Sequence, residues 1–469
     1  MPINKLLLTM ALPLMLSMLV QALYNVVDSI FVGMISQDAF NAVSLAFPIQ
    51  NIIIAIGSGT GVGVNALIAR SLGEKDKEKA NRYAANGLFL GGVSGFVMVF
   101  VGLFVSEPFL KSQTDNPVII EEGVKYLKIC TCLAVFVIVQ CLFERILQST
   151  GKTILSMYTQ GIGAIINIIF DPIFIFAFDM GVSGAAVATV LGQFCGMIAG
   201  IVINKKYNKE LSIQLKGFKP SLRFIGKIYK IGLPSILMIS ISSVMTYMMN
   251  KLLLKIEATE TAAAVFNAYF KLQSFVIMPV IGLAQAMLPI VSFNYGAVNK
   301  KRMLETYKRG LLYALSVLSV GTVLMLVAPE LLLKMFSASD AMLEIGVPAF
   351  RMISVSFIFA SYGIVTSNFF QAVGNGVLSM LMSLIRHLIV LVPTAYLLGY
   401  TLGYQSVWWS LSLAEIVSDI VAVFGWFYIK RKILDKMPKE SPSGENLSNE
   451  SLPNESLPNE NFEKAEAKE

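Results

Sequence analysis

The sequence predicts an all-α polytopic membrane protein whose twelve transmembrane helices form two six-helix lobes. Of its 469 residues, 55% are hydrophobic and only 14% are charged, whereas about 25% are charged in an ordinary soluble protein. Apolar runs of roughly 20 residues, each long enough to cross ~30 Å of hydrocarbon as a helix, recur along the chain. An internal repeat divides these runs into two sets of six. These three observations together define the fold class.

The predicted spans follow one another without the alternating pattern of β-barrel strands, and helices satisfy their own backbone hydrogen bonds in lipid. The first span is too long for a cleaved signal peptide, carries an aspartate, and lacks a small-residue cleavage site after it. The spans are residues 9–33, 44–68, 84–105, 124–146, 154–178, 182–203, 231–254, 262–290, 310–328, 350–371, 377–398 and 407–429.

The repeat has an offset of 221 to 223 residues. "LP" at 12–13 recurs at 233–234, and "QSTGKTILSM" at 148–157 is echoed by "QAVGNGVLSM" at 371–380. Because each half has an even number of spans, the halves are parallel repeats, and we expect a cleft between them that opens alternately to each side. The expected segments are an N-terminal lobe (1–203), a basic cytoplasmic linker (204–230), a C-terminal lobe (231–436) and a disordered polar tail (437–469).

The net charge of +7 would suit nucleic acid, but the placement of the charges argues against that partner. With the N-terminus inside, 26 Lys and Arg fall on the cytoplasmic side and 7 on the other. This asymmetry is the positive-inside rule. We therefore expect a multi-pass protein of the cell (inner or cytoplasmic) membrane, in contact with the lipid bilayer, with both termini cytoplasmic. We also expect a monomer that binds no nucleic acid.

Polar groups in the first span share one helix face. Gln21, Tyr24, Asn25 and Asp28 stand at i, i+3, i+4 and i+7. A carboxylate in hydrocarbon costs roughly 2.5–3.5 kcal/mol on insertion scales, so Asp28 needs a function or a partner.

The fifth span carries a matching pair. Asn167 and Asp171 stand at i, i+4, and Pro172 should disturb the helix there and free backbone carbonyls. Counted from the outer ends of their spans, Asp28, Asp171 and Thr189 lie at a similar depth, roughly 10 Å below the surface at ~1.5 Å per residue. Two carboxylates, an amide and a hydroxyl can therefore converge inside the N-terminal lobe.

Such an oxygen set suits a proton or a hard cation such as Na⁺, and two nearby carboxylates titrate as a coupled pair. The alternative is that these groups only join helices by hydrogen bonds. The second-half counterparts of Asp28 and Asp171 fall near Met249 and Thr394. The repeat itself therefore does not require the acids.

Other polar features admit two interpretations each. Arg386 in the eleventh span can bind carbonyls or respond to substrate charge, and His387 is the only histidine. Glu415 and Asp419 can pair with Arg386 or line the cleft, and the role of Lys271 stays open. The glycine-rich run at 57–63 lacks the GK[ST] of a phosphate loop and predicts close helix packing instead.

The chain resembles the multidrug and toxic compound extrusion (MATE) transporters, above all their bacterial MepA-like members. The resemblance covers about residues 5–430. The segments that carry it are "LPLMLSMLVQALYNVVDSIFVG" (12–33), "ARSLGEKD" (69–76), "ILQSTGKT" (146–153), "NIIFDPIFIF" (167–176) and "GVSGAAVATVLGQ" (181–193).

The resemblance implies two six-helix lobes in a V and efflux of amphipathic organic cations, as in multidrug and antibiotic resistance, in exchange for H⁺ or Na⁺. It implies no other cofactor and no enzymatic activity. It also implies a cation site, a possible Na⁺ site included, at Asp28, Asn167, Asp171 and Thr189. Some sodium-coupled members carry acids on helices 7 and 10. Spans 231–254 and 350–371 have none here, so we do not expect a cation site in the second lobe.

Two alternatives remain. A flippase for a lipid-linked substrate should have a strongly basic cleft, which the few intramembrane Lys and Arg do not supply. An intramembrane aspartyl protease of the presenilin type should carry a GxGD motif, which is missing from the sequence.

Overall fold

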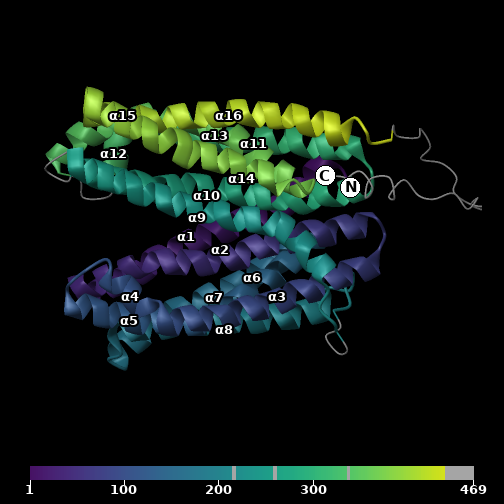
Figure 1. Cartoon of the computed structure of the whole chain (residues 1–469), viewed down its shortest axis with the longest axis horizontal. Coiled ribbons are helices and arrows are strands. Elements are labelled where there is room, and N and C mark those ends of the chain that lie inside the picture. The colour runs from purple at the N-terminus through teal and green to yellow at the C-terminus, as the bar shows by residue number, and fades with distance from the viewer. Residues whose placement is uncertain (214–217, 257–260, 335–338, 439–469) are drawn as a thin grey trace, which may run out of the picture. The chain divides into compact units, whose positions relative to one another are not determined.

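Long helices make up nearly all of the part of the chain that the computed structural model describes, which is residues 1–213, 218–256, 261–334 and 339–438 (Figure 1). Residues 1–437 form one unit, and nearly all of the predicted polar tail lies outside the described residues. In the described ranges eleven helices are long and apolar enough to span a membrane. A twelfth crossing results if the helix pair bent by 46° at residues 133–134 is one span. The predicted all-α polytopic fold is confirmed.

Eight α-helices precede the predicted linker and eight follow it. The first set is α1 (Ile3–Ile35), α2 (Gln37–Gly73), α3 (Lys77–Phe104), α4 (Ser106–Lys111), α5 (Pro117–Cys132), α6 (Val135–Ser149), α7 (Thr153–Pro172) and α8 (Gly181–Tyr207). The second set is α9 (Leu222–Ile256), α10 (Thr261–Gly296), α11 (Lys300–Val327), α12 (Pro329–Lys334), α13 (Asp340–Ala372), α14 (Gly376–Leu384), α15 (Val392–Leu402) and α16 (Trp409–Ile429).

Several helices reach further than predicted, into segments expected to be basic loops. α3 begins at Lys77 and α11 at Lys300, because the side chains of Asp76 and Asn299 cap them by accepting hydrogen bonds from the backbone N–H of Lys79 and Arg302. The expected linker 204–230 is likewise partly helical. α8 runs to Tyr207 and α9 begins at Leu222, so the connection between the lobes is shorter than predicted.

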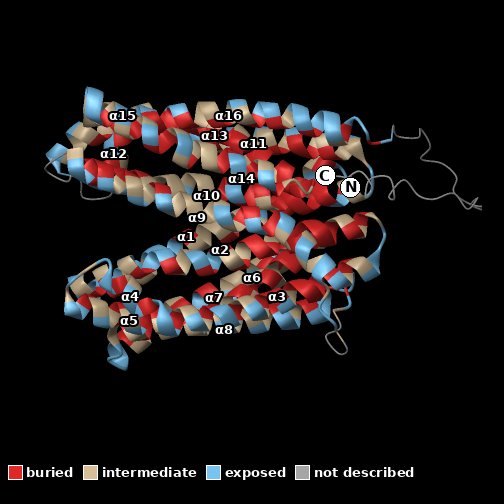
Figure 2. Cartoon of the chain, viewed as in Figure 1, coloured by how far each residue is buried: buried red, intermediate tan, exposed pale blue. Residues whose placement is uncertain are grey.

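The N-lobe (α1–α8) and the C-lobe (α9–α16) meet through the first two long helices of each. α2 packs on α9, and α1 packs on α10. α2 and α10 are the most buried spanning helices, with 72% and 61% of their apolar windows buried. Figure 2 shows buried positions between helices and exposed positions on their outward faces.

Glycines allow the lobes to approach closely along α2. A Cβ on Gly59 would lie 2.5 Å from Ile236 Cγ1, and one on Gly63 would lie 2.4 Å from the carbonyl oxygen of Ile228. At the end of α2, a Cβ on Gly73 would lie 2.0 Å from the carbonyl oxygen of Phe293 on α10. Within the run at 57–63, alternate glycines face α6 and α9. The prediction that this run serves close packing is confirmed.

Candidate functional site

The carboxyl groups of Asp28 and Asp171 lie within hydrogen-bonding reach of each other, one on α1 and one at the end of α7. Asp171 is fully buried, and Asp28 is half-buried. Two carboxyl groups make this contact only when a proton or a cation lies between them. The structure thus joins the two intramembrane acids that the sequence singled out.

Asn167 connects this pair to α8. Its Nδ2 donates to Asp171 Oδ1 at 3.3 Å and to Thr189 Oγ1 at 3.3 Å. The approach of α7 to α8 makes the second bond possible, because Gly163 and Gly192 face each other. A Cβ on Gly192 would lie 2.5 Å from the carbonyl oxygen of Gly163. All four predicted site residues are therefore brought together.

Several oxygens of this group have no hydrogen-bond partner among the described residues. They are Asp28 Oδ1, Asp171 Oδ2 and Asn167 Oδ1, and each is buried. Unpartnered buried oxygens are costly, so this set has the chemistry of a site that binds a proton or a small cation.

Pro172 changes the helix next to the acid, as predicted. α7 ends at Pro172, and residues 173–177 continue as a short π-helix. Proline lacks the N–H that an α-helix needs at that position. π-Bulges of this kind often occur at functional sites.

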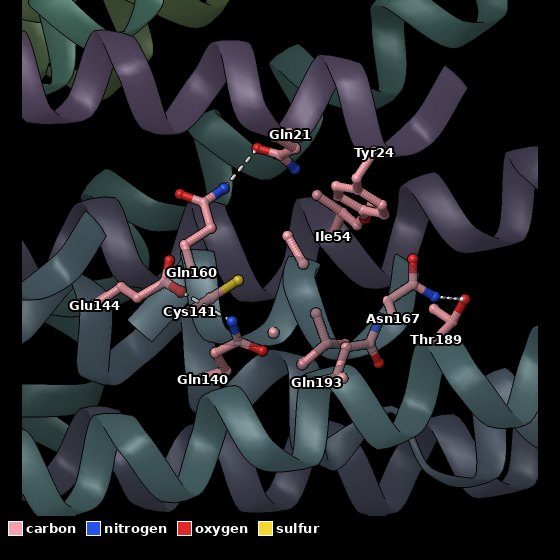
Figure 3. A pocket seen from close by; sticks show the side chains of 14 residues that line it. Gln21, Tyr24, Ile54, Gln140, Cys141, Glu144, Gln160, Asn167, Thr189 and Gln193 are labelled. Atoms are coloured by element: carbon pink, nitrogen blue, oxygen red, sulfur yellow. Dashed lines mark hydrogen bonds between the residues drawn. The ribbon is translucent and has the colours of Figure 1, made fainter. Parts of the chain in front are cut away.

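A polar cavity of about 100 Å³ opens beside the carboxyl pair inside the N-lobe (Figure 3). Gln21 and Tyr24 on α1 line it, as do Asn167 and Thr189. Gln21 accepts a hydrogen bond from Gln160 Nε2 at 3.0 Å. The cavity thus extends from the predicted cation site along α1.

Asn25 does not join this cavity. Its side chain is exposed, and its backbone carbonyl accepts a bond from Ser29 Oγ at 2.8 Å. The helical turn of 100° per residue places it at the opposite edge of the polar face from Tyr24. The prediction that all four polar groups of the first span share one environment is therefore wrong for Asn25.

The sequence analysis missed a further acid, Glu144, which lines the same cavity and accepts from Gln140 Nε2 at 3.0 Å (Figure 3). It stands next to Arg145, which we had counted as a cytoplasmic charge. Arg145 is buried instead and donates to Ser58 Oγ and Gln148 Oε1 at 3.0 and 3.1 Å. The i, i+4 pair of Gln140 and Glu144 was the signal that could have identified this position.

The polar groups of the C-lobe have local partners. Arg386 Nη1 forms an ion pair with Glu415 at 3.1 Å, and His387 Nδ1 lies 3.1 Å from the carbonyl oxygen of Ser383. Asp419 Oδ1 is buried without a partner among the described residues. Lys271 is exposed. Of the two interpretations of Arg386, the structure supports pairing with Glu415.

Paired helical lobes that span a membrane, with a carboxyl pair and a polar cavity inside one lobe, define a class of secondary transporter. The chain belongs to the MatE family: the family model matches residues 13–173 and again residues 234–397. The two matches begin 221 residues apart, which is the offset of the internal repeat.

Curated relatives cover nearly the whole chain. The multidrug export protein MepA of Staphylococcus haemolyticus is 26% identical over 426 residues, which are 90% of this chain and 93% of that protein. MepA of Staphylococcus aureus strain MRSA252 is 25% identical over 438 residues, with 92% and 95% covered.

Solved structures agree with these relatives. An outward-facing multidrug resistance MATE transporter of the MOP superfamily is 28% identical with a TM-score of 0.86 and covers 92% of this chain and 97% of its own. A MOP superfamily transporter from Pyrococcus furiosus is 27% identical, also with a TM-score of 0.86, with 93% and 97% covered. The chain is thus a multi-pass membrane protein of a transporter family.

Proposed function

We propose that the protein is a secondary active efflux antiporter that exports amphipathic organic cations in exchange for protons. The single observation that carries this proposal is the contact between Asp28 and Asp171 beside a polar cavity in one lobe. The relatives named multidrug export proteins support export of many small organic molecules.

The geometry favours a proton over Na⁺ as the coupling ion. Asn167 directs its N–H group, rather than its carbonyl oxygen, toward Asp171 and Thr189. A sodium ion requires oxygen ligands turned toward it, so the amide would have to rotate. A proton shared by two carboxyl groups needs no such change. Na⁺ remains the alternative ion for the same four residues.

The proposed cycle follows from competition between ion and cargo. Cargo enters from the cytoplasm or the inner leaflet, and the lobes then rock to open outward. A proton binds at Asp28 and Asp171 from outside, the neutralised pair repacks α1, and cargo leaves. The protonated carrier returns inward. Ion and cargo must each weaken the binding of the other by the same factor.

The sidedness of this cycle rests on charge. The basic turns after α2, α6 and α10 lie at one end of the helices, which we assign to the cytoplasm by the positive-inside rule. Both termini then face the cytoplasm of a cell membrane, and the protein acts as a monomer. The cavity lining includes no Lys or Arg, so it offers no support for a lipid-pyrophosphate flippase.

Reconstituted vesicles test the proposal. A proton gradient or a sodium gradient is imposed separately, and the movement of a fluorescent organic cation is followed. We expect the proton gradient alone to drive transport, and we expect Asp28→Asn and Asp171→Asn each to abolish that drive. Full gradient-driven transport by both variants would contradict the proposal, and transport driven only by sodium would replace the ion.

A further inference from the structure

Glu144 is a buried-side acid that the proposed cycle does not use. It lines the N-lobe cavity at the end away from Asn167 and Thr189, next to Gln140 and Gln160 (Figure 3). No described residue forms an ion pair with it. Arg145, its neighbour in sequence, directs its guanidinium to Ser58 and Gln148 instead.

We propose that Glu144 is the proton-release group of the transporter, which receives the proton that leaves the Asp28–Asp171 pair and passes it to the cytoplasm. This inference rests on the proposed proton antiport. It adds a second titratable station inside the lobe, on the route that the proton must take after the carrier has turned inward.

Cavity size supports a water-filled route rather than a drug site. The cavity of about 100 Å³ holds a few water molecules at ~30 Å³ each, whereas pockets for drug-sized ligands are ~300–1,000 Å³. Gln160, beside Glu144, precedes Asp171 by three helical turns of α7, roughly 16 Å at 1.5 Å per residue. Direct transfer over that distance is excluded, so cavity water must carry the proton.

Polar groups continue from Glu144 toward the turn between α6 and α7. Gln148 accepts from Arg145 and donates from Nε2 to Ser156 Oγ at 3.0 Å. That turn carries Lys152 and lies at the end assigned to the cytoplasm. The proton balance is simple. The aspartate pair gives one proton to cavity water, the Glu144 carboxylate takes up one proton, and it then releases that proton to cytoplasmic water.

The surroundings of Glu144 leave it as the acid of this cavity. Gly91 and Gly95 of α3 meet Leu142 and Val135 of α6 in apolar contacts. The titratable groups and polar side chains nearest to it or lining the same cavity are Cys141 and Arg145 on its own helix, Ser58 on α2, Thr159 and Gln160 on α7, Gln193 on α8, and Gln21 and Tyr24 on α1.

Everted membrane vesicles test this role, because the cytoplasmic face is then outside. Acid-inside vesicles accumulate ethidium while the outer pH is varied at a constant pH difference. We expect the wild-type rate to vary with outer pH. We expect Glu144→Gln to slow accumulation about tenfold and to flatten that pH profile, and Glu144→Asp to restore the profile. Gln193→Met changes the same lining without removing an acid and should keep the wild-type profile.

Each result decides between the hypotheses. A Glu144→Gln profile parallel to wild type, or a flat profile for Gln193→Met, would overturn the role of Glu144 while leaving the antiport proposal intact. Gradient-driven accumulation by Asp28→Asn and Asp171→Asn would instead overturn the antiport proposal. Failure of Glu144→Asp to restore the profile would assign Glu144 a packing role.

Discussion

Asp28 on α1 and Asp171 on α7 lie within hydrogen-bonding reach of each other inside the N-lobe. Their contact crosses between two helices that pack together, so any change in the charge of the pair acts on the packing of α1. Because α1 also packs on α10 of the C-lobe, the pair is placed to influence how the lobes meet. The predictions below follow from this arrangement.

The first prediction ranks the two polar partners of the pair. Asn167→Leu removes hydrogen bonds to Asp171 and Thr189, whereas Thr189→Val removes one hydroxyl of the same shape. A hydrogen bond to a charged group contributes ~1.5–3 kcal/mol and a neutral one ~1 kcal/mol. We therefore expect proton-driven transport to fall about tenfold or more for Asn167→Leu and about fivefold for Thr189→Val. An equal loss in both variants would indicate that the hydroxyl is an essential sodium ligand.

The second prediction concerns the close approach of the lobes at Gly73. A methyl group there would lie 2.0 Å from the carbonyl oxygen of Phe293, so Gly73→Ala must push α2 and α10 apart. Overpacking costs ~1–3 kcal/mol, and we expect vesicle transport to fall roughly tenfold. Gly92→Ala is the matched control, since a Cβ on Gly92 meets nothing within 4 Å. Equal transport by both variants would show that this approach is dispensable.

The third prediction concerns the ion pair of the C-lobe. Arg386 and Glu415 have side-chain exposures of 25% and 14%, so removing one partner leaves a charge in a largely dry site. Arg386→Met or Glu415→Met alone should lower stability by ~3 kcal/mol, and the double variant should recover most of it. Thermal unfolding in detergent measures this. A double variant less stable than both single variants would contradict a purely structural pair.

Much of the fold followed from sequence because hydrophobic length and charge asymmetry act locally on each helix. The repeat gave the number of helices in each lobe, and the depth argument identified Asp28, Asn167, Asp171 and Thr189 as neighbours. Helix ends were less predictable, since caps such as Asp76 extend helices into charged segments. Asn25 was misplaced because four positions on one helix face still diverge by up to 100°.

Glu144 shows the main limit of the sequence argument. Its position one turn from the expected end of a span, beside an arginine, looked like a cytoplasmic loop. Only the packing of α6 against α7 and α8 reveals that it lines the cavity. The partnership of Arg386 with Glu415, rather than with substrate, likewise depends on tertiary contacts that a single sequence does not specify.

Cargo-induced proton release tests the central claim most directly. Purified protein in weakly buffered detergent solution is mixed with ethidium, and a pH indicator reports protons given up on binding. If ion and cargo displace each other at the Asp28–Asp171 pair, wild-type protein should release about one proton per bound cation. Asp28→Asn and Asp171→Asn should bind the cation without that release. Cation binding by wild-type protein with no proton release, or equal release by both variants, would contradict the account.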